Sequence, residues 1–234
     1  MKNKKTFSLR ALGAIALLCV VSTLLCSCSK GNKFVSDGAD FVDKKTDVSY
    51  LYAPACYEPI ERGDEIYGQT KTVTFYEIKG QDPLKLLCEE NGAVFYAEGT
   101  SLPTLDKMNI SYMEICSESD SLTVKKKVES KADISTIVES YVMGENLYYG
   151  AVVPTQTYKI RFADTSLGIY YSFVFVRYTD EIAGKGHDFI YNRYEGKFTP
   201  APEILVEYIN ELSKESSDSQ ILGGAYPAGS ADRA

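Results

Sequence analysis

The sequence predicts an α+β fold: a single domain in which an antiparallel, tyrosine-rich sheet packs against two or three helices. Three observations lead to this prediction. Several short segments alternate between apolar and polar residues, as strands with one wet face do. Other segments place apolar residues at helical spacing and fall between groups of strands without strict alternation, which favours α+β. The chain also has 18 tyrosines and no tryptophan, and tyrosine is favoured in sheets.

The strands are expected from period-two patterns. In TYKIRFA, 157–163, three apolar residues share one face while Lys159 and Arg161 share the other. The segment LTVKKKV, 122–128, repeats this pattern with its leucine and both valines facing inward. The segment 169–178 is apolar on both faces, which indicates a central strand covered on both sides. Further strands are expected at 48–52, 72–79, 93–97, 110–116 and 188–192, and a tight turn within 193–198 is expected to close a hairpin with the last of them.

Three helices are expected between these strands. Ser130 is a candidate N-cap for the first, with Asp133 three residues later, and Gly144 ends it. The second covers 202–212 and starts with a proline in its first turn. The third is a two-turn helix over 82–91, because a proline stands at its first position and Asn-Gly follows its last apolar residues.

The N-terminal segment has the layout of a secretory signal peptide. Residues 1–10 carry four basic residues and no acid, and residues 11–26 are almost wholly apolar. This apolar run is shorter than the roughly 20 residues that a membrane-spanning helix needs. A basic segment followed by a short apolar segment and small residues is typical of a peptide that is removed after export.

Three cysteines lie within this apolar run or just after it, and Cys28 has the most suitable neighbours. Leu25 stands three residues before it and Ser27 immediately before it, whereas Cys26 and Cys19 each follow a leucine. The stretch resembles the lipobox of bacterial lipoproteins, in which a peptidase cuts before a cysteine that carries a diacylglyceryl thioether. The resemblance implies cleavage between Ser27 and Cys28 and lipidation of Cys28. The alternative is an ordinary cleaved signal peptide with an incidental cysteine.

This resemblance also implies a location. Two or more acyl chains hold a protein stably on a membrane without a spanning helix, so the chain is expected at the cell membrane, lipid-anchored on its extracytoplasmic side. The residue after Cys28 is Ser29 rather than an aspartate. In a cell with two membranes, the sorting pattern of the lipoprotein family then implies the outer membrane.

Four parts of the chain are expected. They are a lipoprotein signal peptide at 1–27, a lipidated tether at 28–46, an α+β domain at 47–213 and a disordered C-terminal tail at 214–234. The tether and the tail are polar and lack a core-facing period. They are therefore expected to bury too little apolar surface to offset the entropy lost on ordering.

The charge of the mature chain argues against nucleic-acid partners and against adhesion to anionic lipid headgroups, because both need a positive surface. Removal of residues 1–27 takes away four basic residues and no acid, which leaves 21 basic and 32 acidic residues and a net charge of −11. No nucleic-acid partner is therefore expected.

Candidate chemical groups are few, and no catalytic or cofactor-binding motif is present. His187 is the only histidine, and its neighbour Asp188 would point to the opposite strand face. After Cys28 the cysteines are Cys56, Cys88 and Cys116, whose spacing matches no zinc pattern. Two oxidation states are open for these cysteines: one disulfide with one free thiol, or three buried reduced thiols. Their apolar surroundings favour three reduced thiols. The acid pairs are Glu89–Glu90 and Glu118/Asp120, and adjacent tyrosines stand at 148–149 and 170–171, where each ring of a pair should face a different side.

These observations predict a membrane-anchored extracytoplasmic lipoprotein that acts as a non-catalytic binding or interaction module of the cell envelope. Its expected partners are the membrane, through lipid on Cys28, and an envelope protein or glycan. The many tyrosines are expected to pack within the sheet, and the alternative is a tyrosine-lined face that recognises a protein or a sugar. No cofactor and no metal are expected. One alternative is a cell-wall or extracytoplasmic hydrolase that uses carboxylates or His187, and another is an inhibitor or sensor lipoprotein.

Overall fold

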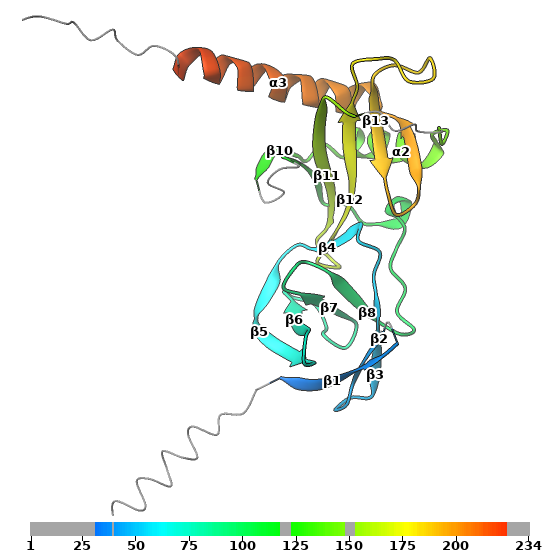
Figure 1. The fold of residues 1–234 in the computed structure, drawn as a ribbon, viewed down its shortest axis with the longest axis vertical. Coiled ribbons are helices and arrows are strands. Elements are labelled where there is room, and N and C mark those ends of the chain that lie inside the picture. The colour runs from blue at the N-terminus through cyan, green and yellow to red at the C-terminus, as the bar shows by residue number, and fades with distance from the viewer. Residues whose placement is uncertain (1–30, 39, 118–122, 148–152, 224–234) are drawn as a thin grey trace, which may run out of the picture.

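Two β units make up the folded part of the chain (Figure 1). The computed structural model describes residues 31–38, 40–117, 123–147 and 153–223. The first unit is a closed barrel and the second is a larger antiparallel sheet that packs against two α-helices. Strand β1 and helix α3 lie at opposite ends of the molecule (Figure 1).

The barrel is formed by the N-terminal part of the chain. Its strands are β1 (Asn32–Asp37), β2 (Asp40–Asp43), β3 (Val48–Tyr52), β5 (Arg62–Gln69), β6 (Thr74–Ile78), β7 (Leu86–Glu89) and β8 (Val94–Ala97). They are ordered β1-β2-β3-β8-β7-β6-β5. All neighbours are antiparallel except β1 and β5, whose short parallel pairing closes the barrel. Aromatic rings fill the interior, where Phe34 stacks on Phe75 with 4.4 Å between ring centroids.

The second sheet holds the remaining strands. They are β9 (Tyr112–Ser117), β10 (Val124–Val128), β11 (Gln156–Asp164), β12 (Ile169–Arg177), β13 (Asp188–Asn192) and β14 (Lys197–Pro200). Their order is β10-β9-β11-β12-β13-β14, and β4 (Tyr57–Pro59) pairs with the start of β12. Helices α2 (Lys131–Met143) and α3 (Glu203–Gly223) pack on one face through the same hydrophobic cluster as the sheet, and a short 3-10 helix, η1, covers Leu105–Lys107.

One hydrophobic cluster joins the two units. It includes Ile78, Leu86 and Val94 from barrel strands together with Phe162 and Leu205 from the second sheet and α3. The strand β4 continues this connection, because it follows the barrel strand β3 in the chain and yet hydrogen-bonds with β12. The boundary between barrel and second sheet is therefore held by both packing and backbone pairing.

The predicted α+β class is wrong, because the described residues are mostly strand and hold only two α-helices. The clearest error is the helix expected over 82–91. That segment instead contains β7, followed by a turn at Asn91–Gly92 that leads into β8. Gly92 has a φ of +88°, and an Asn-Gly pair between two apolar runs is a strong hairpin signal. A short apolar run does not distinguish helix from strand by periodicity alone.

The expected tether and tail boundaries also need correction. Residues 32–37 and 40–43 form β1 and β2, two strands of the barrel wall, so the folded unit starts well before residue 47. Pairing with neighbouring strands supplies the backbone hydrogen bonds that a polar segment needs in order to fold. At the other end, α3 continues through residue 223, past the expected limit at 213. Residues 1–30, which include the expected signal peptide, and residues 224–234 lie outside the described residues.

Several other predictions are confirmed. Strands β3 and β13 have the expected bounds, β13 and β14 form the predicted hairpin, and β12 is buried on both faces. The predicted helix after Ser130 is α2, and the Ser130 side chain accepts a hydrogen bond from the Asp133 backbone N–H at 3.4 Å. In β10 the predicted inward face is only partly correct. Val128 is buried, but Val124 is 42% exposed, because the register with β9 shifts between Val124 and Lys126.

Candidate functional site

A cavity of about 590 Å³ lies where the barrel meets the face of the second sheet that is turned away from α2 and α3. It is called the inter-sheet cleft here. Its lining comes from β3, β4, β5, the β7–β8 turn and β11. The residues are Tyr52, Ala55, Tyr57, Glu58, Pro59, Ile60, Arg62, Glu90, Asn91, Gly92, Ala93, Lys159 and Arg161.

Strand β11 supplies two cations to this cleft. Because side chains alternate along a strand, Lys159 and Arg161 face the cleft while Ile160 faces the helices and is fully buried. The Lys159 Nζ lies 2.5 Å from Glu58 Oε1. The Ser172 hydroxyl donates to the same carboxylate oxygen at 2.8 Å. Glu58 is therefore held in place by a partner on each of two neighbouring strands.

Arg161 lies deeper than Lys159. Its Nη2 donates to Glu114 Oε2 at 2.7 Å, and each of the two side chains is only 11% exposed. Its guanidinium carbon lies 4.3 Å from the centre of the Tyr170 ring, within the range of a cation–π contact. The Nε donor is buried and has no hydrogen-bond partner. Arg161 thus forms a rigid, charged floor for the cleft.

The barrel side of the cleft is more exposed. The Arg62 guanidinium lies 4.3 Å from the Tyr76 ring centre. Its Nη1 is 3.8 Å from Glu90 Oε1, in a pair whose side chains are 39% and 78% exposed. A long, exposed ion pair of this kind contributes little stability, so Arg62 can exchange Glu90 for another anion at small cost. Tyr52 is 50% exposed, and its ring packs edge-on against Phe95 at 5.5 Å.

This arrangement is suited to binding. The lining carries three cations and two carboxylates, on a chain whose net charge is strongly negative. Half-exposed tyrosine offers a rigid apolar face together with a hydroxyl. Hydrogen-bond donors and acceptors are both within the same cavity. A ligand with a carboxylate and several hydroxyl groups would find partners for both kinds of group.

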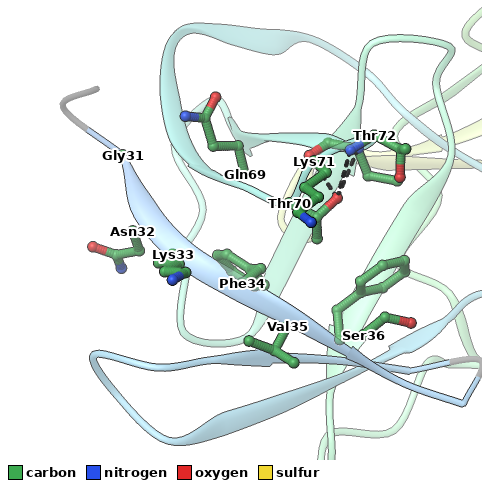
Figure 2. Close-up of a pocket in the computed structure, with 12 residues that line it drawn as sticks. Gly31, Asn32, Lys33, Phe34, Val35, Ser36, Gln69, Thr70, Lys71 and Thr72 are labelled. Atoms are coloured by element: carbon green, nitrogen blue, oxygen red, sulfur yellow. Dashed lines mark hydrogen bonds between the residues drawn. The ribbon is translucent and has the colours of Figure 1, made fainter. Parts of the chain in front are cut away.

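A second cavity, the N-terminal pocket, has a volume of about 650 Å³ and lies between β1 and the β5–β6 turn. Its lining is residues 31–36, Phe41 and residues 69–73. Figure 2 shows the Phe34 side chain between β1 and the turn that carries Thr70 and Lys71. The turn is held by the Thr70 hydroxyl, which accepts from the Val73 backbone N–H at 2.8 Å. Val35 is 40% exposed at this pocket.

A cluster of hydroxyls and a carboxylate lies on the face of the second sheet that packs against α2. The Tyr141 hydroxyl donates to Glu195 Oε2 at 2.5 Å, and the Tyr171 hydroxyl donates to Glu195 Oε1. Asn192 Nδ2 donates to the Tyr171 hydroxyl at 2.7 Å. Burial, assisted by Glu195, raises the pKa of Tyr141 and that of Tyr171, so both stay protonated. The cluster ties the β13–β14 turn to α2 and β12.

The three thiols are buried and free, which confirms the expectation of reduced cysteines. Burial raises the pKa of Cys56 to about 12 and that of Cys88 to about 12. Cys88 lies in β7 rather than in the helix expected over 82–91. None of the three has the lowered pKa that marks a reactive thiol.

The residues proposed for chemistry are placed as follows. Ser27 and Cys28 lie outside the described residues. His187 is exposed in the loop before β13. The carboxylate of Asp188 accepts from Arg177 Nε at 2.5 Å rather than from the His187 side chain. In the part of the chain that the structure describes, no group of three His, Cys, Asp or Glu side chains could hold a metal ion, and no helix is long and apolar enough to span a membrane.

The paired acids and tyrosines also have distinct environments. Glu89 is half-buried and Glu90 exposed, while Glu118, Asp120 and the tyrosines at 148–149 lie outside the described residues. The prediction for 170–171 is confirmed: both rings are buried and face opposite sides. The Tyr170 hydroxyl pairs with the hydroxyl of Tyr112, whereas that of Tyr171 bonds Glu195.

Reasoning from sequence missed the cleft itself. The alternation in 157–163 correctly put Lys159 and Arg161 on one polar face, but no pattern indicated that the barrel would stand opposite them. Asn91 and Gly92 were assigned to a helix end, and the hairpin signal of this pair would have placed them in a turn. Arg62 and Tyr52 carry no distinguishing local signal.

Comparisons with protein-family models, curated proteins and solved structures found no match to this chain.

Proposed function

We propose that this protein is a membrane-anchored extracytoplasmic lipoprotein of the cell envelope, held by lipid on Cys28, and that its folded part is a non-catalytic binding module. The lipobox-like residues before Cys28 support the anchor. One observation above all supports the binding role: the inter-sheet cleft gathers Arg62, Lys159 and Arg161 with half-exposed Tyr52 at one cavity between the two β units.

The ligand class that fits this lining best is an acidic glycan. A sugar offers hydroxyls that both donate and accept hydrogen bonds, and the cleft presents cations and carboxylates side by side. An acidic sugar adds a carboxylate for Arg62, whose own partner Glu90 is distant and exposed. Tyr52 supplies a ring face against which the apolar side of a sugar can pack.

The hydrolase alternative has less support. His187 is exposed, and the carboxylate of its neighbour Asp188 is bonded to Arg177 rather than to the imidazole. Glu58, the most enclosed carboxylate of the cleft, is already bonded to Lys159 and Ser172. A sensor or inhibitor would also act through a binding surface, so the identity of the bound ligand separates these roles.

A titration tests the binding role. Oligosaccharides rich in uronic acids are titrated into the purified protein by calorimetry, with neutral oligosaccharides of equal length for comparison. The acidic sugars should bind, and Tyr52→Ala and Arg62→Ala should each weaken binding by about tenfold or more. Tyr194→Ala, which removes an exposed tyrosine from the β13–β14 turn, should leave the affinity unchanged. Equal affinities for wild type and both cleft variants would refute the site, and equal affinities for acidic and neutral oligosaccharides, or no binding of either, would refute the acidic-glycan class.

A labelling experiment tests the anchor. Cells that express the full chain are fed an alkyne fatty acid, and the protein is tagged after purification. Wild type and Cys26→Ala should carry label, and Cys28→Ala should not. Label that persists on Cys28→Ala would show that another residue is modified.

A further inference from the structure

The distance between the proposed lipid and the folded barrel is much shorter than the sequence pattern suggested. A tether through residue 46 would have let the folded part move freely above the membrane. The barrel instead includes β1, which starts at Asn32, and Gly31 already packs against it, with Ile66 and Gly68 beside it. Only Ser29 and Lys30 separate Cys28 from Gly31. Three residues span no more than about 11 Å even when fully extended.

The maximum distance between Cys28 and Gly31 is similar to the thickness of the headgroup layer of a membrane. The headgroup region on each side of a bilayer is about 5 to 8 Å thick. A lipidated cysteine has its acyl chains in the hydrocarbon layer, so Gly31 must lie within the headgroups or just above them. The end of the barrel that carries Gly31 is therefore the end that meets the bilayer.

The N-terminal pocket is at this end. Gly31 is part of its lining, and the lining is mostly apolar, with Phe34, Val35 and Phe41 contributing side chains. Val35 is an apolar residue of the barrel wall with 40% of its surface exposed. Lys33 and Lys71 are exposed at the same pocket, and lysine side chains near a membrane pair with lipid phosphates.

We propose that the N-terminal pocket lies against the bilayer surface, with Val35 and the β5–β6 turn in contact with lipid and with Lys33 and Lys71 at the headgroup phosphates. This inference rests on the proposed lipidation of Cys28. Helix α3 lies at the opposite end of the molecule (Figure 1), so α3 points away from the membrane and the inter-sheet cleft is raised above it by the barrel.

The absence of tryptophan from the chain makes a fluorescence test direct. Val35→Trp and Thr72→Trp each place one tryptophan at the N-terminal pocket, on β1 and on the β5–β6 turn. Val153→Trp is the matched control, because Val153 is 84% exposed and lies on the α3 side of the molecule. It stands just before the first residue of β11, Gln156, which hydrogen-bonds with Ser213 of α3. The mature lipidated variants are reconstituted into phosphatidylethanolamine and phosphatidylglycerol vesicles, with or without lipids brominated near the glycerol end of the acyl chain.

The expected result is that brominated lipid removes more than half of the emission at positions 35 and 72, with a blue shift for Val35→Trp, and leaves that of Val153→Trp unchanged. Circular dichroism shows whether each variant is folded. Because the two pocket positions lie on separate elements, the test still works if one of these variants does not fold. Equal quenching at all three positions, or none at 35 and 72, overturns the proposal.

Flotation of the same samples tests the lipid anchor separately from the orientation of the barrel. If wild type floats with vesicles, Cys28→Ala does not and the pocket positions stay unquenched, the orientation is wrong while the anchor holds. If Cys28→Ala floats as well as wild type, the anchor itself is wrong.

Discussion

Asn32 Nδ2 donates a hydrogen bond to Asp43 Oδ2 at 2.7 Å, joining the first residue of β1 to the last residue of β2. Asp43 is fully buried. Thr46 Oγ1 donates to it at 2.9 Å, the Lys45 backbone N–H at 2.9 Å and the Tyr67 hydroxyl at 3.4 Å. A single carboxylate thus fixes β1, the β2–β3 loop and β5, and makes a segment that looks like a polar linker part of the barrel.

Asp43→Ala should lower the free energy of unfolding by about 3 kcal/mol. The substitution leaves four hydrogen-bond donors without their acceptor. Because the Asp43 site is buried, water does not fully replace the lost bonds. Urea denaturation followed by circular dichroism measures the change. Asp37→Ala, at an exposed aspartate of β1, should change stability by no more than about 0.5 kcal/mol. Similar effects of the two substitutions would show that Asp43 does not organise the barrel.

A chain that starts at Asp47 should not form the barrel, whereas a chain that starts at Gly31 should. Removal of β1 and β2 takes away the pairing that closes the barrel and exposes an edge of β3 and of β5. Dispersed amide signals in a two-dimensional NMR spectrum report on folding of each chain. A well-dispersed barrel in the chain that starts at Asp47 would restore the view of 28–46 as a tether.

Tyr171→Phe should destabilise the protein by about 1 to 3 kcal/mol. Its hydroxyl accepts from Asn192 and donates to Glu195, so its removal leaves a buried amide donor unpaired and a carboxylate with one partner fewer. Thermal unfolding should show a lower midpoint for this variant than for wild type. Tyr194→Phe, at a 57% exposed ring, is the control and should unfold as wild type does. An unchanged midpoint in Tyr171→Phe would mean that the Glu195 cluster is not stabilising.

Stability should fall as the pH rises above about 9. Burial raises the pKa of Cys56 and of Cys88 to about 12, and it also raises the pKa of Tyr57 to about 12. The same groups in the unfolded chain titrate near about 8.5 for cysteine and 10 for tyrosine. The native state therefore holds these protons more tightly, and its advantage is complete below the unfolded pKa values and decreases above them. Urea midpoints measured from neutral to alkaline pH should be level and then decline; a constant midpoint through about pH 11 would contradict this.

The strand content of the second sheet could be predicted from sequence to a large extent. The alternation in 157–163 places β11 correctly, because a period of two depends only on which face is buried. The segment 169–178 places β12 correctly because a continuous apolar run marks a strand that is covered on both faces. The barrel could not be predicted in the same way. Its closure depends on β1 meeting β5 in parallel, a contact between segments about 36 residues apart that no local pattern encodes.

The candidate site was predictable only in its parts. Lys159 and Arg161 were correctly assigned to one polar face, but the barrel residues opposite them, Arg62 and Asn91, come together with β11 only through the tertiary fold. The 82–91 segment also shows that local pattern alone does not determine the structure. Its proline start and apolar run fit a helix locally, and pairing with β6 and β8 overrides that preference.

The most direct test of the account is the intact mass of the protein extracted from the membranes of the cells that produce it, with fragmentation of its N-terminal peptide. We expect a chain that starts at Cys28, lacks residues 1–27 and carries the mass of a diacylglyceryl group on the Cys28 thiol. A chain that keeps residues 1–27, or that begins elsewhere without lipid, would contradict the anchor and, with it, the placement of the barrel at the bilayer.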